Sequence, residues 1–337
     1  MAYTGFQEPC ACGSGKKYED CCFIKDAIEF MQGNGSAIGQ RLKEMAESGK
    51  FSSLQEAQVA LDRLVKDWNY SPLDDFCGLS PYQMTRLLYD PFGPESPARY
   101  NLELSDFPET PFLRILRLLL TGLSPRGLRT TAKGNLPRNF CQESARIYYG
   151  EEGYREKTRY GGFRQEQDWG EIHTVRLTAE MAGFVKKERG RFRLTRKGEQ
   201  AFSRGLNGKF FLDFFKAYTR KFNWAYRDRW PGINLVQDSF LFTLFCLHQF
   251  GDVVRPGTFY GDLFLRAFPK VLNEVPQGPY WSPEEQVQKC FSLRALDRFA
   301  GFFGFAEIRR PDQIMSKLPI ELKKKPLLDH WIHFKVE

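Results

Sequence analysis

The sequence predicts a mainly α-helical protein with short β-hairpins and a compact cysteine-rich knuckle at its N-terminus. Apolar residues recur at helical spacing through most of the chain, short β-branched or aromatic runs flank glycine turns, and half of the eight cysteines fall within residues 10–22. With 337 residues, of which 42% are hydrophobic and 15% aromatic, the chain can bury sizeable cores and is long enough for two or three domains.

Four cysteines near the N-terminus follow the spacing C-x-C-x8-C-C. Two thiolate pairs joined by a short loop can close a tetrahedron around one soft divalent ion, and zinc is the usual occupant. Gly13 and Gly15 allow a tight reversal between the pairs, while Lys16 and Lys17 can offset the negative charge of four thiolates. The spacing therefore favours a structural zinc site.

Two other interpretations compete with zinc. A disulfide knot requires an oxidising compartment, and nothing in the sequence indicates export. A phosphate loop is suggested by the run 13–16, but Cys10 stands where the first Walker glycine belongs and Lys17 stands where Ser or Thr should hold magnesium. Four protein ligands would leave no open position on the metal, so zinc catalysis is not expected.

Residues 9–22 resemble the SEC-C motif, a small zinc-binding module known from the C-terminal tail of the preprotein translocase SecA and from many bacterial proteins. The family pattern is C-x-C-G-S-G-K-K-Y, then two residues, then Cys followed by Cys or His, and this chain matches it throughout. Glu19 and Asp20 stand where members are commonly basic, and no Walker A motif occurs. The resemblance covers roughly the first 25 residues. It implies a bacterial protein with one structural Zn²⁺ held by Cys10, Cys12, Cys21 and Cys22.

The N-terminal third divides into two predicted parts. A zinc-binding module over 1–32 contains a helix at Phe23–Met31, and the run Gly33–Ser36 separates that helix from the next segment. A helical segment and linker then covers 33–110. Its expected elements are a helix at Leu54–Trp68, a helix at Tyr82–Leu88 capped by Ser80-Pro81, and a linker with five prolines over 91–111.

The segment 111–205 has the order of a winged-helix domain, and the run from Ala182 to Gly198 resembles the end of such domains in bacterial regulators. Its expected elements are helix Pro111–Leu120, strand Leu128–Thr131, helix Leu136–Tyr149, a polar loop over 150–169, helix Ile172–Ala182, and strands Phe184–Lys187 and Arg191–Thr195.

The segment 206–337 is predicted to be a helical, second winged-helix-like domain. Its first helix, Phe210–Trp230, interleaves aromatic and basic residues, and the three- and four-residue spacing favours an amphipathic core helix over a platform for stacked bases. Helices Asn234–Phe250, Tyr260–Phe268 and Ser292–Phe303 follow, and then hairpin strands Phe305–Arg309 and His330–Val336. The expected fold is therefore a zinc knuckle plus one or two winged-helix-like domains.

The first hairpin is the main candidate for nucleic-acid contact. Its basic side chains could project from a wing toward phosphates, and the alternative is a solvated edge hairpin that charge protects from aggregation. The preceding helix offers His173, Thr174 and Arg176 for recognition, but also Glu171 and Glu180, which phosphates would repel. The candidate residues are Lys186, Lys187, Arg189, Arg191, Arg193, Arg196 and Lys197.

Other possible sites are weaker. Cys77, Cys141, Cys246 and Cys290 are isolated in the sequence and are expected to be small core residues. The pair Cys246 and His248 lies in an apolar helix and lacks a partner pair at ligand spacing. The run 323–325 of three lysines is expected to be a solvated loop.

Charge and motifs narrow the function. The net charge of +8 makes nucleic acid a plausible partner, and the chain shows neither a signal peptide nor a membrane span, so we expect a cytoplasmic protein. Motifs of hydrolases, kinases and dinucleotide enzymes are missing. We expect a non-enzymatic, nucleic-acid-binding or regulatory protein. The alternatives are an adaptor that docks a chaperone, ribosome or mobile-element partner, and an enzyme without a recognisable motif.

Overall fold

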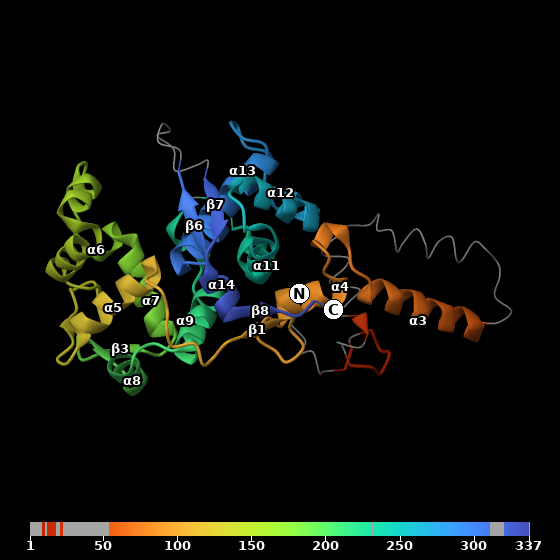
Figure 1. Ribbon diagram of the computed structural model, residues 1–337, viewed down its shortest axis with the longest axis horizontal. Coiled ribbons are helices and arrows are strands. Elements are labelled where there is room, and N and C mark those ends of the chain that lie inside the picture. Colours follow the sequence, from red (N-terminus) through yellow and green to blue (C-terminus); the bar gives the residue numbers. More distant parts are fainter. Residues whose placement is uncertain are drawn as a thin grey trace.

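The computed structural model describes residues 9–10, 12–17, 21–22, 54–228, 230, 232–310 and 320–336. The predicted helix Phe23–Met31 and the break at Gly33–Ser36 lie outside the described residues. The described chain is mainly helical and carries small antiparallel sheets (Figure 1), which confirms the predicted fold class at this coarse level.

Two helices predicted in the N-terminal third are present. The elements of this part are α3 (Leu54–Tyr70), η2 (Asp74–Phe76), α4 (Pro81–Tyr89) and β1 (Ala98–Tyr100). Ser80 fixes the start of α4, because its hydroxyl accepts from the backbone N–H of Gln83 and the Gln83 side chain accepts from the N–H of Ser80. Strand β1 lies where only a linker is expected, since it pairs with a strand near the C-terminus.

Residues 111–194 form the first unit, in the order helix, strand, two helices and hairpin. Its elements are α5 (Pro111–Leu123), β2 (Leu128–Arg129), α6 (Arg138–Thr158), η3 (Glu166–Asp168), α7 (Gly170–Met181), β3 (Val185–Glu188) and β4 (Arg191–Leu194). The antiparallel sheet has the order β2-β4-β3. The predicted loop over 150–169 is wrong in its first half, because α6 continues to Thr158 across a kink at Gly150.

Two helices and a short turn connect the units. They are α8 (Arg196–Arg204), α9 (Gly208–Arg220) and η4 (Trp224–Arg227). Phe211, Phe214, Phe215 and Tyr218 of α9 are buried, which confirms a core helix here, but the predicted helix Phe210–Trp230 is wrong beyond Arg220, where α9 ends. Phe214 stacks on Phe184 of the first unit with ring centroids 4.1 Å apart, and Phe215 packs edge-on against Trp331 of the C-terminal part at 4.8 Å. The buried apolar residues of both parts therefore form one continuous core.

Residues 234–324 form the second unit. Its elements are α10 (Asn234–Asp238), α11 (Phe240–Phe250), β5 (Arg255–Pro256), α12 (Gly257–Ala267), η5 (Pro269–Glu274), α13 (Pro283–Phe291), the π-helical η6 (Ser292–Gly301), β6 (Ala306–Arg309) and β7 (Glu321–Lys324). Two further elements, α14 (Pro326–Trp331) and β8 (Ile332–Phe334), come after it.

The second hairpin differs from the prediction in its last strand. Strand β6 pairs with β7, so the expected partner strand His330–Val336 is wrong. Residues 332–334 instead pair with β1, which ties the C-terminus to the proline-rich segment. The expected lysine loop is wrong as well, because Lys323 and Lys324 lie in β7.

The two units share one topology. The second sheet has the order β5-β7-β6, so in each unit the short strand that follows α5 or α11 pairs with the last strand of the hairpin. Each hairpin also begins in the same way. Gly183 and Gly304 have φ of 77° and 82°. The phenylalanine that follows each glycine donates its N–H to the carbonyl of the residue five positions earlier, Phe184 to Ala179 and Phe305 to Ala300. The same backbone hydrogen bonds thus form twice along the chain.

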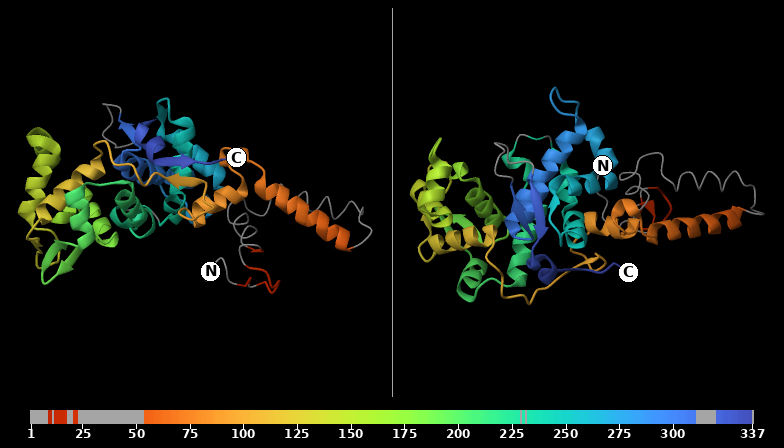
Figure 2. Two further views of the ribbon diagram at one scale, coloured as in Figure 1. Left: turned by 60° about the horizontal axis from the view of Figure 1, so that its bottom comes forward. Right: turned by 45° about the horizontal axis from the view of Figure 1, so that its top comes forward.

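The elements are spread along one long axis. The three views of Figures 1 and 2 place α3 at one end of the molecule and α6 at the other, with α9 and the second unit between them. The cysteine-bearing segment lies toward the α3 end, and the β3–β4 hairpin lies toward the α6 end. None of the helices in the described part of the chain combines the length and apolar composition that crossing a bilayer requires.

Replacing the two equivalent glycines by alanine should have unequal effects. Both substitutions impose left-handed strain of about 1–2 kcal/mol. A Cβ at Gly183 would meet no atom within 4 Å, whereas one at Gly304 would overlap the side chain of Thr110. We expect Gly304→Ala to lower the free energy of unfolding by about 2–4 kcal/mol and Gly183→Ala by about 1–2 kcal/mol, measured by denaturant unfolding. Equal losses would contradict this account.

Candidate functional site

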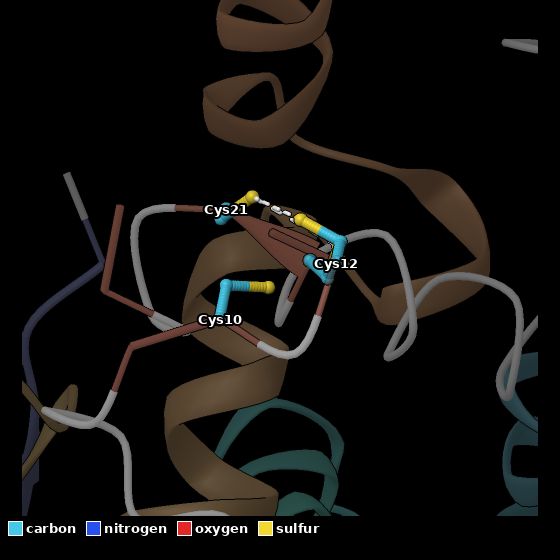
Figure 3. Close-up of side chains that lie close together, drawn as sticks. Cys10, Cys12 and Cys21 are labelled. Carbon is cyan, nitrogen blue, oxygen red and sulfur yellow. Dashed lines mark hydrogen bonds between the residues drawn. The ribbon is translucent and has the colours of Figure 1, made fainter. Parts of the chain in front are cut away.

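The four N-terminal cysteines converge on one point, and Figure 3 shows Cys10, Cys12 and Cys21 directed toward one another. The four sulfur atoms, Cys22 included, all lie within 4.8 Å of one another. The loop between the pairs is closed by two backbone hydrogen bonds, from the Cys10 N–H to the Lys16 carbonyl (2.8 Å) and from the Gly13 N–H to the Cys10 carbonyl (3.1 Å). Local backbone geometry therefore brings the thiols together.

Two of the sulfur separations are close to the edge of a tetrahedron around a metal ion. Zinc–sulfur bonds of about 2.3 Å place tetrahedral sulfurs roughly 3.8 Å apart. The Sγ atoms of Cys12 and Cys21 are 3.4 Å apart, and those of Cys21 and Cys22 are 3.9 Å apart. A disulfide would need about 2.05 Å, and all eight cysteines are free thiols. The disulfide alternative is therefore wrong, and the residues present fit a metal ion.

The thiols perturb one another strongly. Hydrogen bonds from the Ser14 hydroxyl, and then from the Cys10 and Cys21 thiols, lower the pKa of Cys12 to about 6. Hydrogen bonding to Cys10 and Cys12 raises the pKa of Cys22 to about 12. The four thiols can all ionise at this separation only if a cation lies at their centre. Four sulfur ligands close the coordination shell and suit a structural role.

Ser14 contacts the cysteine cluster, although the sequence alone assigns it no role. Its Oγ lies 3.0 Å from the sulfur of Cys21, and it also accepts from the N–H of Lys16 at 3.3 Å. A hydroxyl that donates to a ligand sulfur orients that ligand and stabilises its thiolate. The serine is part of the matched family pattern, which is the signal that could have identified it.

Five of the seven candidate residues lie on the β3–β4 hairpin or its turn, whereas Arg196 and Lys197 begin α8, so the prediction that all seven project from one hairpin is wrong. The seven also differ in exposure. Arg191 and Lys197 are partly buried and serve the fold. Arg191 donates to the carbonyls of Arg126 and Gly127 at 3.3 and 3.1 Å, and Lys197 pairs with Asp213 at 2.7 Å. The other five side chains are exposed on the surface, and they are Lys186, Lys187, Arg189, Arg193 and Arg196.

Two of the exposed cations face each other across the hairpin. Lys186 and Arg193 are cross-strand partners in the β3–β4 register, and like charges at such positions are destabilising. Glu188 lies 3.2 Å from Lys186 and offsets one charge. The hairpin therefore keeps a net positive charge on its exposed side chains. This charge does not stabilise the fold, because the cross-strand pair is repulsive.

Helix α7 does not present a recognition surface. His173, Thr174 and Arg176 are each no more than 5% exposed, so the expectation that they could read a groove is wrong. The reason is Glu166, which is fully buried. One of its oxygens accepts from His173 Nδ1 and Arg176 Nε at 2.7 and 2.6 Å, and the other accepts from the Leu136 N–H at 2.6 Å. The polar face of α7 is thus turned into the core.

The remaining cysteines and the second histidine also have defined surroundings. Cys77 and Cys246, which are far apart in the sequence, place their sulfurs 3.8 Å apart, so they are not isolated. Cys141 and Cys290 are buried core residues as expected. His248 contacts Asp329 at 2.6 Å and belongs to a salt-bridge group with Lys324, and in the described chain the only cluster fit for a metal is the N-terminal one.

The comparison with protein families gives one match. The SEC-C motif matches residues 8–23, which contain all four clustered cysteines. No curated protein and no solved structure matches the chain. The site and the match together define a metal-binding module of the SEC-C type at the N-terminus, attached to a much longer helical chain.

Proposed function

We propose that the N-terminal cysteines hold one structural zinc ion, and that the chain is a non-enzymatic binding protein of a reducing, cytoplasmic setting. The zinc assignment is supported by a four-sulfur cluster in which two separations are close to a tetrahedral edge, and by the match to the SEC-C motif. Free thiols throughout the described chain accord with a reducing compartment. The metal would order the first residues and take no part in chemistry.

We further propose that the two units are winged-helix-like domains, at 111–205 and within 206–337, and that the first contacts nucleic acid. The shared strand order of the two sheets, β2-β4-β3 and β5-β7-β6, supports the domain assignment. The observation that carries the nucleic-acid proposal is the basic hairpin, where Lys186 and Arg193 are cross-strand partners and Glu188 offsets only one of the two charges. Because α7 is turned inward, contact would be made to phosphates and not to base edges. Binding would therefore be insensitive to sequence.

The test is a gel-shift series with a random-sequence duplex. If each of the five exposed basic residues contacts one phosphate, the plot of log affinity against log salt has a slope near −4.5. Affinity should then fall about 500-fold between 50 and 200 mM salt. The double variant Lys186→Ala/Arg193→Ala should reduce the slope by about 1.8 without loss of stability, because it removes a repulsive pair. The control Lys209→Ala/Lys335→Ala removes two exposed charges elsewhere and should leave the slope unchanged.

A flat salt dependence, or equal effects of the two double variants, would reject nucleic-acid contact at the hairpin. The inward orientation of α7 favours a second candidate function, an adaptor that binds protein partners, because the unit lacks an exposed reading helix. Co-purification of a partner that survives nuclease treatment, together with a failed gel shift, would support the adaptor.

A further inference from the structure

A cavity of about 610 Å³ lies between the two units and is distinct from both the cysteine cluster and the basic hairpin. Its walls come from α6 and α7 on one side and from η4, η6 and β6 on the other. This volume suits a small organic ligand. Basic side chains outnumber the three acidic ones, Glu171, Asp297 and Glu307, in its lining. The basic ones are Lys157, Arg227, Arg294, Arg298, Arg310 and Lys325.

Arg227 lies across the N-terminus of α7. A Cβ placed on Gly170, the first residue of that helix, would overlap its guanidinium. Its Nη1 donates to the Thr174 hydroxyl at 2.7 Å, and the nearest carboxylate, that of Glu171, is 4.0 Å away. A cation at the positive end of a helix dipole is unfavourable unless an anion joins it. The carboxylate of Glu171, in the first turn of α7, offsets part of this charge, and the guanidinium, with five N–H donors, can still donate to an anion in the cavity.

Arg298 adds charge on the opposite wall. Asp228 accepts two hydrogen bonds from Arg294, at 2.9 and 2.6 Å, and Arg298 reaches the same carboxylate only at 3.4 Å. One carboxylate is therefore shared by two guanidiniums. The pKa of Arg227 is lowered by burial first, and the nearby positive charge of Arg298 lowers it further although Glu171 opposes this. Both arginines line the cavity, so an anion bound there would be attracted by both guanidiniums.

Aromatic rings form the rest of the wall. Tyr148, Tyr149 and Phe302 line the cavity and are half-buried, so their rings are reachable from inside it. Lys157 lies over the Tyr149 ring with its Nζ 5.8 Å from the centroid, at the same rim. An aromatic wall can pack against a planar group, and the nearby guanidiniums of Arg227 and Arg298 can bind a phosphate. The cavity therefore fits a ligand that contains both groups.

We propose that this cavity binds a nucleotide. Its phosphate would lie between Arg227 and Arg298 at the N-terminus of α7, and its base would pack against the aromatic wall. The site is independent of the nucleic-acid contact proposed for the hairpin, since the two share no residue.

The test is calorimetric titration of the full chain with AMP, adenosine, inorganic phosphate and ATP. AMP and ATP should bind at least ten times more tightly than adenosine, because a charge-assisted phosphate contact is lost in the nucleoside. Inorganic phosphate should bind at least ten times more weakly than AMP, because it lacks the ring. Equal affinity for AMP and adenosine, equal affinity for AMP and phosphate, or failure of all four to bind at millimolar concentration would each overturn the proposal.

Three variants locate the site. Arg227→Met should weaken AMP about 10–100-fold. Gly170→Ala should weaken it about ten-fold with an unchanged melting temperature, because the new methyl group displaces the guanidinium while alanine suits a helix. Lys157→Ala should weaken it several-fold, whereas Arg155→Ala, an exposed charge on the same helix outside the cavity, should not. AMP binding that survives both Arg227→Met and Gly170→Ala would refute the site. Lys186→Ala/Arg193→Ala should leave AMP affinity intact.

Discussion

Replacing Cys10 and Cys21 together by serine is expected to reduce bound zinc from one ion per chain to none. Each change removes one sulfur from a different pair, and two remaining thiolates cannot complete a tetrahedral shell. Elemental analysis of the purified full chain measures the stoichiometry. Cys77→Ser serves as the matched control, because it removes a thiol outside the cluster and should retain the ion.

The structural consequence should be confined to the N-terminal module. The described core runs from residue 76 to residue 332 apart from Cys10, so the rest of the chain carries its own buried apolar surface. Chelation of the wild-type protein should therefore make the first ~25 residues sensitive to protease and leave the main unfolding transition in place. Full metal retention by the double variant would reject the site, and global unfolding on chelation would reject its independence.

Glu166→Gln is expected to cost about 2–3 kcal/mol of folding free energy, because it leaves the buried guanidinium of Arg176 with Glu180 as its remaining carboxylate partner, at 2.8 Å. The substitution preserves shape, so the loss would report charge and not a cavity. Denaturant unfolding measures it, with the exposed Glu143→Gln as control. A loss below about 1 kcal/mol would show that His173 and Arg176 do not depend on this carboxylate.

Glu166 also makes the folding stability depend on pH in the acid range. Burial alone would raise the pKa of Glu166, but the hydrogen bond from His173 and the charge of Arg176 hold it below its usual value. A lowered folded-state pKa gives stability that is present above the unfolded value of about 4.3 and is lost as pH falls through the folded value. The wild-type protein should therefore lose stability below about pH 4, and Glu166→Gln should lack that part of the loss.

Local signals identified most of the elements. The stripe from Leu54 and the Ser80 cap predicted α3 and α4, and the glycine turn after Glu188 predicted the first hairpin to within a residue or two. Each of these depends on neighbours within one or two turns of chain. The cysteine spacing is also a local signal, because the short loop between the two cysteine pairs determines where the four sulfurs converge.

The continuation of α6 beyond Gly150 is a local failure, but the other main failures are non-local. Strand β7 pairs with β6 in place of residues 330–336, since a strand that suits several partners is assigned only by the packing around it. Cys77 meets Cys246 because η2 and α11 both pack against α12. No periodicity in the polar run before α7 indicates that Glu166 is buried.

The sequence by itself determined the metal-binding loop, the helical class and the basic hairpin, because ligand spacing, amphipathic period and turn residues act over a few positions. Only the tertiary structure decided that α7 faces inward, that the two units share a topology, and that Arg227 and Arg298 meet across a cavity. The physical reason is burial: a polar side chain enters the core only where a partner from another element neutralises it, and that partner is selected by packing.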